Sequence, residues 1–298
     1  MKTFLVTGAI GGLGLEIVKN LVKSRKNRVF MAMRNYDKGL KIADELDGNI
    51  EVLQLDLSLL ANIRNFLQKW DMPLDGLINN AGVQFVNETK FTRDGFEETI
   101  AVNHLAAFML TTGLMPHLTG GSVLFMGSGT HNPNYPFGKM FGFRGAQYTT
   151  MNDLLEGKSN AQTTKQKNLD RYATSKLLNT IMAVELSRRF KTFSSYALDP
   201  GMMPGTGLAR DHSRTLQFLW KKVMPIMGHF LPDTTTTRRS GKVAAWIMET
   251  STIKNQSGEI FSYNKKPSKY VWKEVALNEK IGREVYEDSM KIIGNYLE

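Results

Sequence analysis

Short apolar runs alternate with longer amphipathic segments over the first 130 residues, and this alternation constrains the fold more than any other feature of the chain. We expect strands at Phe4–Val6, Val29–Met33, Val52–Leu55, Leu77–Ile78 and Val123–Met126, and helices at Leu13–Lys23, Lys38–Leu46, Leu59–Trp70 and Phe96–Leu114. Strands that alternate with helices of this length need crossover connections, which place the strands parallel in one sheet. The sequence therefore predicts an α/β fold with a doubly wound, mostly parallel sheet.

The rhythm changes in the second half of the chain. Residues 131–168 are polar and lack a clear period, whereas residues 205–232 are apolar and basic. The regular elements expected here are helices at Tyr172–Phe190 and Ser240–Glu249, strands at Phe193–Leu198 and Glu259–Tyr263, and a helical tail at Val271–Leu297. Because no internal repeat or linker-like tract interrupts the pattern, we predict one domain over residues 1–298 with insertions at about 131–168 and 205–232.

The composition excludes several classes of protein. With 42% hydrophobic and 22% charged residues the chain is globular rather than disordered. It has no cysteine, and its five histidines form no HxH or HxxxH pair, so we expect neither disulfides nor a metal site. The net charge of +10 suits an anionic cofactor or an acidic membrane surface, but its basic runs are only pairs, so no nucleic-acid partner is expected. Since no apolar run is long enough for a signal peptide or a span, we predict a cytoplasmic protein, with peripheral membrane contact as an alternative.

A glycine-rich turn joins the first strand to the first helix. Thr7 opens it, and Gly8, Gly12 and Gly14 follow with G-x-x-x-G-x-G spacing. Glycine lets the backbone turn sharply and approach a pyrophosphate, and the helix start around Leu13 offers unpaired N–H groups to the anion. The position between a strand and a helix favours dinucleotide binding over an ordinary tight turn, which is the alternative.

The residues after the second and third strands indicate which dinucleotide is bound. Arg34 stands where an acidic residue would hold the ribose hydroxyl of NAD, and a guanidinium suits a 2′-phosphate. We therefore predict NADP(H) in preference to NAD(H), with a solvated surface arginine as the alternative. Asp56 and Leu57 are expected at the same edge of the sheet, near an adenine.

Tyr172 and Lys176 lie four residues apart on a predicted helix, so they share a face. A phenol has a pKa of about 10, and a nearby ammonium lowers that pKa toward the range in which tyrosine works as a general acid or base. Ser128 ends the fifth strand, where its hydroxyl can bond a substrate oxygen; Thr130 is a candidate substitute. The alternatives are a chance pair on a solvated helix and a serine in a turn.

Four motifs in this order make the chain similar to the short-chain dehydrogenase/reductase family over nearly its whole length. They are Thr7-Gly8-x-x-x-Gly12-x-Gly14, Asn79-Asn80-Ala81-Gly82, Ser128, and Tyr172-x-x-x-Lys176. The resemblance implies a Rossmann fold and a nicotinamide cofactor. It also implies that Ser128, Tyr172 and Lys176 are catalytic, with Tyr172 and Lys176 contacting the cofactor as well.

The same resemblance implies roles for further residues. Asn103 would support a water that relays protons to the lysine; a buried structural asparagine is the alternative. The cofactor would be framed by Asn79 and Gly82 and contacted by Asn80 and Ala81. Pro200 and Gly201 would lie over the nicotinamide, with Thr206 near its carboxamide or, alternatively, capping a helix.

The spacing of the motifs indicates a branch of the family. Tyr172 lies 44 residues after Ser128, a separation that resembles the branch of light-dependent protochlorophyllide reductase and the retinol-dehydrogenase-like enzymes. Three further stretches resemble that branch: Thr92–Glu97, Pro200–Leu208 and Ser257–Asn264. The reductase has a cysteine where this chain has Met202, so the light-driven reaction is not expected.

We therefore predict an NADPH-dependent oxidoreductase that transfers hydride between the nicotinamide and a carbonyl or alcohol of an apolar substrate, with Tyr172 as acid/base. The alternatives are protochlorophyllide-reductase-like reduction of a conjugated C=C bond, and a non-catalytic NADPH-binding sensor or scaffold. Residues 205–232 would form a lid over the substrate, a core cover or dimer contact, or a membrane contact, and residues 131–168 an opposite wall or a surface loop. The resemblance is compatible with a monomer or a homodimer.

Overall fold

One parallel sheet organises the protein. A computed structural model describes residues 1–204 and 233–297. Within them, seven strands follow the order β3-β2-β1-β4-β5-β6-β7, and every pairing is parallel. The strands are β1 (Lys2–Thr7), β2 (Asn27–Met33), β3 (Asn49–Gln54), β4 (Gly76–Asn79), β5 (Ser122–Met126), β6 (Ser194–Asp199) and β7 (Ile260–Ser262). The predicted doubly wound α/β fold is confirmed.

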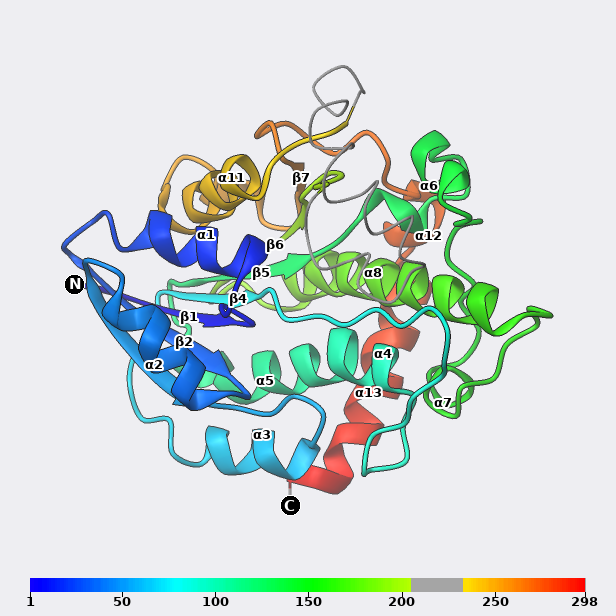
Figure 1. Ribbon diagram of the computed structural model, residues 1–298, viewed down its shortest axis with the longest axis horizontal. Coiled ribbons are helices and arrows are strands. Elements are labelled where there is room, and N and C mark those ends of the chain that lie inside the picture. Colours follow the sequence, from blue (N-terminus) through cyan, green and yellow to red (C-terminus); the bar gives the residue numbers. More distant parts are fainter. Residues whose placement is uncertain (205–232, 298) are drawn as a thin grey trace.

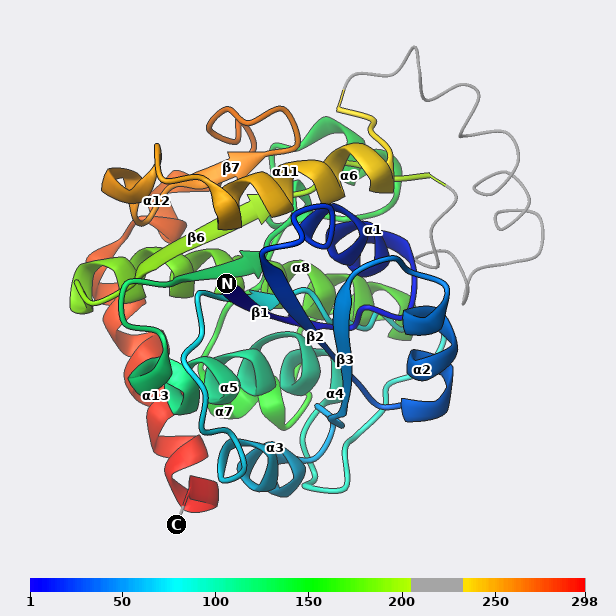
Figure 2. The same cartoon turned by 90° about the vertical axis from the view of Figure 1, so that its left-hand side faces the viewer.

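Helices cover both faces of this sheet (Figure 1, Figure 2). One face carries α1 (Gly12–Leu21) and α11 (Thr237–Glu249), which pack against each other. The other carries α3 (Leu60–Leu67), α5 (Ala106–Leu114) and α8 (Thr164–Arg189), and α13 (Glu279–Leu297) packs on α8 and α3. The shorter helices are α2 (Tyr36–Asp44), α4 (Glu98–Ile100), α6 (Pro136–Met140), α7 (Met151–Leu155) and α12 (Lys273–Ala276). No helix of the described residues is long and apolar enough to cross a membrane.

Strand β1 shows why apolar runs became central strands. Phe4, Leu5 and Val6 are completely buried. Successive side chains of a strand point to opposite faces, so Leu5 joins the core under α3, α5 and α8, while Phe4 and Val6 join the core under α1 and α11. A parallel strand covered on both faces therefore reads as a continuous apolar run instead of an alternating one.

Helix α8 begins at Thr164, earlier than the expected start at Tyr172. Thr163 caps it by accepting a hydrogen bond from the backbone N–H of Gln166 at 3.2 Å. The first turns carry polar side chains and no apolar period, so the helical pattern was not visible there. Tyr172 consequently lies inside a long helix, and a rigid element holds its side chain.

Two other predicted helices are interrupted. The stretch Phe96–Leu114 contains a π-helical turn, Ala101–Leu105, between α4 and α5. The helical tail is broken between α12 and α13, where the side chain of Asn278 accepts hydrogen bonds from two backbone N–H groups of α13. Neither interruption is marked by glycine or proline, so the apolar spacing alone did not reveal it.

The structure describes one of the two expected insertions. Residues 131–168 contain α6, α7 and the start of α8. Residues 205–232, with Thr206 among them, lie outside the described residues, so the lid, interface and membrane-contact hypotheses for this segment stay predictions.

Candidate active site

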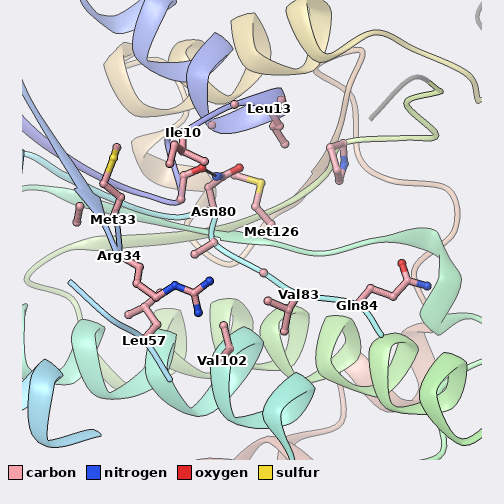
Figure 3. Close-up of a pocket in the computed structure, with 18 of the residues that line it drawn as sticks. Ile10, Leu13, Met33, Arg34, Leu57, Asn80, Val83, Gln84, Val102 and Met126 are labelled. Atoms are coloured by element: carbon pink, nitrogen blue, oxygen red, sulfur yellow. Dashed lines mark hydrogen bonds between the residues drawn. The ribbon is translucent and has the colours of Figure 1, made fainter. Parts of the chain in front are cut away.

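A cavity of about 640 Å³ opens at the carboxyl ends of the strands, where the strand order reverses between β1 and β4 (Figure 3). Open α/β sheets bind ligands at this point of the fold, and the volume suits a large cofactor. The predicted site residues that line it are Gly8, Gly12, Leu13, Gly14, Arg34, Asp56, Leu57, Asn80, Ala81, Gly82, Ser128, Tyr172, Lys176, Pro200 and Gly201. Lining residues that the sequence reasoning missed include Asn35, Lys38, Ser58, Val83, Gln84, Glu98, Val102, Met126 and Met203.

The glycine loop needs its glycines for two different reasons. Gly8 has φ of 67°, and a Cβ there would lie 2.8 Å from the Cα of Ala81. Gly12 has φ of 56°, but a Cβ there would meet no atom of the described residues within 4 Å, so its backbone is open on that side. Helix α1 starts here with no side-chain cap and no acidic residue in its first turn. Its N–H groups and positive helix end thus remain available to an anion.

Thr7 acts behind this loop and does not line the cavity. Its buried hydroxyl accepts hydrogen bonds from the backbone N–H groups of Asn80 at 3.1 Å and Ala81 at 3.0 Å. The amide of Asn80 returns a bond to the carbonyl oxygen of Thr7 at 2.9 Å. These bonds join the glycine loop to the loop after β4.

Asn79 points away from the cavity and donates to the hydroxyl of Thr111 at 2.9 Å.

Two cationic residues lie at the β2 end of the cavity. Arg34 follows β2, and Figure 3 shows its guanidinium extending into the cavity above Val102. Asn35 caps α2 by accepting a hydrogen bond from the backbone N–H of Lys38 at 2.9 Å, and this turn brings Lys38 into the cavity lining. A guanidinium and an ammonium in one cavity lining are donors suited to phosphate. The sequence gives no motif for Lys38 as a lining residue, because its position depends on where α2 begins.

Carboxylates accompany these cations. Asp56 lines the cavity, but one of its oxygens accepts hydrogen bonds from the backbone N–H of Ser58 at 3.0 Å and from its hydroxyl at 2.7 Å. Burial raises the pKa of Glu98, and the charges of Lys90 and Arg34 oppose that rise. Glu98 had no signal in the sequence, because it lies on a short helix with no motif.

Tyr172 and Lys176 face the same end of the cavity from α8, as their spacing predicts. The Lys176 Nζ lies 5.5 Å from the centre of the Tyr172 ring and donates to the carbonyl oxygen of Met126 at 3.3 Å. Burial lowers the pKa of Lys176 to about 8. Burial also raises the pKa of Tyr172, with a smaller contribution from the charge of Asp199. The pKa of Tyr172 is therefore raised by desolvation, and the lowering expected from the Lys176 ammonium is not found.

Ser128 is prepared to donate a hydrogen bond. Its Oγ accepts from the hydroxyl of Thr130 at 3.0 Å and from the backbone N–H of Thr130 at 3.3 Å. The serine hydrogen remains available for an oxygen in the cavity. Thr130 does not line the cavity, so it supports Ser128 and does not replace it.

Asn103 lies behind the cavity wall, in the π-helical turn. Its amide nitrogen donates to the carbonyl oxygen of Val83 at 2.9 Å and to the hydroxyl of Ser175 at 3.0 Å, and its Oδ1 accepts from the N–H of Val83 at 2.7 Å. A Cβ at Gly82 would lie 3.2 Å from that Oδ1 and 3.5 Å from the Lys176 Nζ. Asn103 thus sits beside Lys176, but it is fully buried and holds the loop after β4. π-turns are frequent at functional sites.

The insertion at 131–168 supports the site from outside. The ring of Phe143 lies 6.0 Å from the ring of Tyr172, and the ring of Tyr135 lies 4.5 Å from that of Tyr270. None of the described residues that line the cavity comes from this insertion. The insertion therefore backs Tyr172 with an aromatic contact.

Comparisons with known proteins agree with this arrangement. The family model of the short chain dehydrogenases matches residues 2–142. The chain is 31% identical to the protochlorophyllide reductase of Pisum sativum over 97% of this chain and 77% of that one, and 30% identical to protochlorophyllide reductase B of Hordeum vulgare over 97% and 78%.

Solved structures share the fold. A protein from Mycobacterium paratuberculosis superposes with a TM-score of 0.73 at 24% identity, over 99% of this chain and 94% of that one. A short chain dehydrogenase from Shigella flexneri complexed with NADP has a TM-score of 0.60 at 21% identity, over 88% and 97%. The motifs, the fold and these relatives agree: the chain belongs to the short-chain dehydrogenase/reductase family of oxidoreductases.

Proposed function

We propose that the protein is an NADPH-dependent oxidoreductase that reduces a carbonyl, or oxidises the corresponding alcohol, of an apolar small molecule. One observation carries the proposal. A single cavity holds Ser128, Tyr172 and Lys176 on the β5 and β6 side, and bare glycine backbone with Arg34 on the β1 and β2 side. The first group suits proton transfer to an oxygen, and the second suits a dinucleotide with an extra phosphate.

The cavity residues fit such a cofactor. The open backbone at Gly12 and the uncapped start of α1 would hold the diphosphate. Arg34 and Lys38 would hold a 2′-phosphate, and Asp56 with Leu57 would border the adenine. On the other side, Asn80–Gly82 and Lys176 would contact the nicotinamide half beneath Pro200 and Gly201. When bound, the cofactor supplies or accepts the hydride.

The side chains then have distinct tasks in a reduction. Ser128 donates its hydrogen to the substrate oxygen and orients the carbonyl. Tyr172 transfers its phenolic proton to that oxygen as the carbon receives the hydride, so C=O becomes CH–OH. The phenolate left behind is stabilised by the Lys176 ammonium, and a proton from solvent restores the phenol. Oxidation of an alcohol uses the same groups in reverse.

The lining beside these groups favours an apolar substrate. Val83, Met126 and Met203 border the catalytic end of the cavity, and Phe143 packs against Tyr172. Apolar walls with a few convergent polar groups are typical of small-molecule sites.

The test is a turnover screen. Purified protein is mixed with NADPH or NADH and a panel of apolar aldehydes, ketones and conjugated alkenes, and the reduced cofactor is followed by absorbance. We expect consumption of NADPH in preference to NADH. Tyr172→Phe should abolish turnover while the NADPH dissociation constant stays within about twofold, because the phenol hydrogen acts on the substrate. Preference for NADH, or turnover by Tyr172→Phe, would contradict the proposal.

A second candidate is reduction of a conjugated C=C bond. The observation that favours it is the identity of about 30% with protochlorophyllide reductases over 97% of the chain. The same cavity could present a hydride to a carbon–carbon bond, with Tyr172 protonating carbon in place of oxygen. Product analysis of an α,β-unsaturated ketone separates the two candidates, because carbonyl reduction yields an allylic alcohol and alkene reduction a saturated ketone.

A further inference from the structure

Asp199 is a partly buried carboxylate directly before the loop proposed to cover the nicotinamide. It ends β6, directly before Pro200 and Gly201. Oδ1 accepts from the backbone N–H of Gly201 at 3.1 Å, and Oδ2 accepts from the hydroxyl of Ser268 at 3.1 Å. The backbone N–H of Gly129 is a third donor. Asp199 thus joins the loop after β5, the loop after β6 and the segment after β7.

The charge of Asp199 has no cation against it in the part of the chain that the structure describes, where it forms no ion pair with Lys, Arg or His. The neighbouring charge is Asp233, itself bonded by the hydroxyl of Tyr270. Burial, with a smaller contribution from the charge of Asp233, raises the pKa of Asp199 on balance, and the three hydrogen bonds oppose that rise. The three donors stabilise the ionised form of the carboxylate.

The same charge acts on Tyr172. The Asp199 carboxylate adds to the rise in the pKa of that phenol, so it favours the protonated, proton-donating form. The other titratable groups around Asp199 are Tyr135, Tyr263 and Tyr270, which its charge affects in the same direction. The cation nearest to Tyr172 among the contacts of the described residues is Lys176, whose Nζ lies 5.5 Å from the centre of the ring.

We propose that Asp199 is a positioning residue whose negative charge favours the oxidised form of the bound cofactor and so directs the site toward substrate reduction. The inference rests on the proposed function. The nicotinamide ring is neutral when reduced and cationic when oxidised, so a fixed negative charge beside its binding loop stabilises the oxidised form selectively. When bound, the cofactor would supply the hydride to the substrate carbon while Tyr172 gives its proton to the substrate oxygen, and the positive charge of the oxidised cofactor would be stabilised by Asp199, directly before the Pro200–Gly201 loop.

Equilibrium binding tests this without turnover. Dissociation constants for NADP⁺ and NADPH are measured by isothermal titration calorimetry at pH 7.5 for the wild-type protein, Asp199→Asn and Ser268→Ala. We expect Asp199→Asn to weaken the binding of NADP⁺ more than that of NADPH. The dissociation constant of NADP⁺ divided by that of NADPH should rise on the order of tenfold. Ser268→Ala removes one hydrogen bond to Asp199 and leaves its charge, so it should shift both constants together and preserve the ratio.

Each outcome has a definite meaning. Equal changes in both constants for Asp199→Asn would show a purely structural residue and would overturn the inference while leaving the proposed function intact. Binding of neither cofactor form by the wild-type protein would overturn the proposed function first, and this inference with it. If circular dichroism shows that Asp199→Asn does not fold, Asp199→Ser removes the same charge with a smaller hydrogen-bonding group. The same rise in the ratio of the two dissociation constants is expected for it.

Discussion

Replacing Lys176 with methionine should make the protein more stable. Lys176 is only 5% exposed, and burial lowers its pKa from 10.5 to about 8. A group whose charged form is penalised in this way destabilises the folded state whenever it is charged. Methionine has similar length and no charge, so the penalty disappears. Charged groups buried at functional sites commonly lower the stability of the folded protein.

The structure sets the size of the effect. The lowered pKa corresponds to about 3 kcal/mol of folding free energy. Loss of the contact with the Tyr172 ring removes part of the gain. The carbonyl oxygen of Met126, which Lys176 bonds, keeps a second donor, the side-chain amide of Asn179 at 3.2 Å, so no buried acceptor is left unpaired. We therefore expect Lys176→Met to raise the free energy of unfolding by about 2 kcal/mol at pH 7.

The gain should depend on pH in a defined direction. Below about pH 8 Lys176 is charged in both the folded and the unfolded protein, so the wild type bears the whole penalty. Between about 8 and 10.5 the unfolded chain holds the proton and the folded protein does not. The stability of the wild type therefore rises with pH in this window, and the advantage of Lys176→Met shrinks toward its upper end.

Urea denaturation of both proteins at pH 7 and pH 10 measures the effect. Lys242→Met is the matched control, because Lys242 is an exposed lysine on α11 and its replacement should change the free energy of unfolding by no more than about 0.5 kcal/mol at either pH. If Lys176→Met were no more stable than the wild type at pH 7, or kept its full advantage at pH 10, the buried ammonium would not be the source of the penalty.

The cofactor end of the cavity leads to two further predictions. Arg34→Gln should weaken the binding of NADPH by about 10- to 100-fold, which corresponds to one charge-assisted hydrogen bond, and should change the binding of NADH little. Titrations with both cofactors measure this, and equal losses of affinity for both would contradict a 2′-phosphate role. Gly8→Ala should lower both stability and NADPH affinity, since its Cβ would lie 2.8 Å from backbone and φ is 67°. The Cβ of Gly12→Ala would meet no atom of the described residues within 4 Å, so this change should cost about 1–2 kcal/mol of stability but abolish most NADPH binding. Thermal melts with and without NADPH distinguish the effects of the two substitutions.

Much of the fold was predictable because its signals are local. Apolar runs such as Phe4–Val6 became strands buried on both faces, and the glycine spacing placed the phosphate loop at the first strand–helix junction. The spacing of Tyr172 and Lys176 placed both on one helix face, and both line the cavity. Residue type, spacing and order were sufficient here, since each relation spans one turn or one strand.

Other features had no local signal. Lys38 enters the cavity only because Asn35 caps α2 just before it, and Thr130 supports Ser128 through a side-chain bond that no spacing rule predicts. Asp199 looked like an ordinary residue at the end of a strand. Its three donors come from segments around residues 129, 201 and 268, which only the folded sheet brings together.

The sequence by itself therefore determined the α/β class, the family and the identity of half of the residues that line the cavity. The tertiary structure decided how those groups behave. The low pKa of Lys176 and the high pKa of Tyr172 come from burial under distant segments, and the charge of Asp199 acts through space between elements far apart in the chain. Motifs specify which chemical groups are present, whereas desolvation and long-range charge depend on everything packed around them.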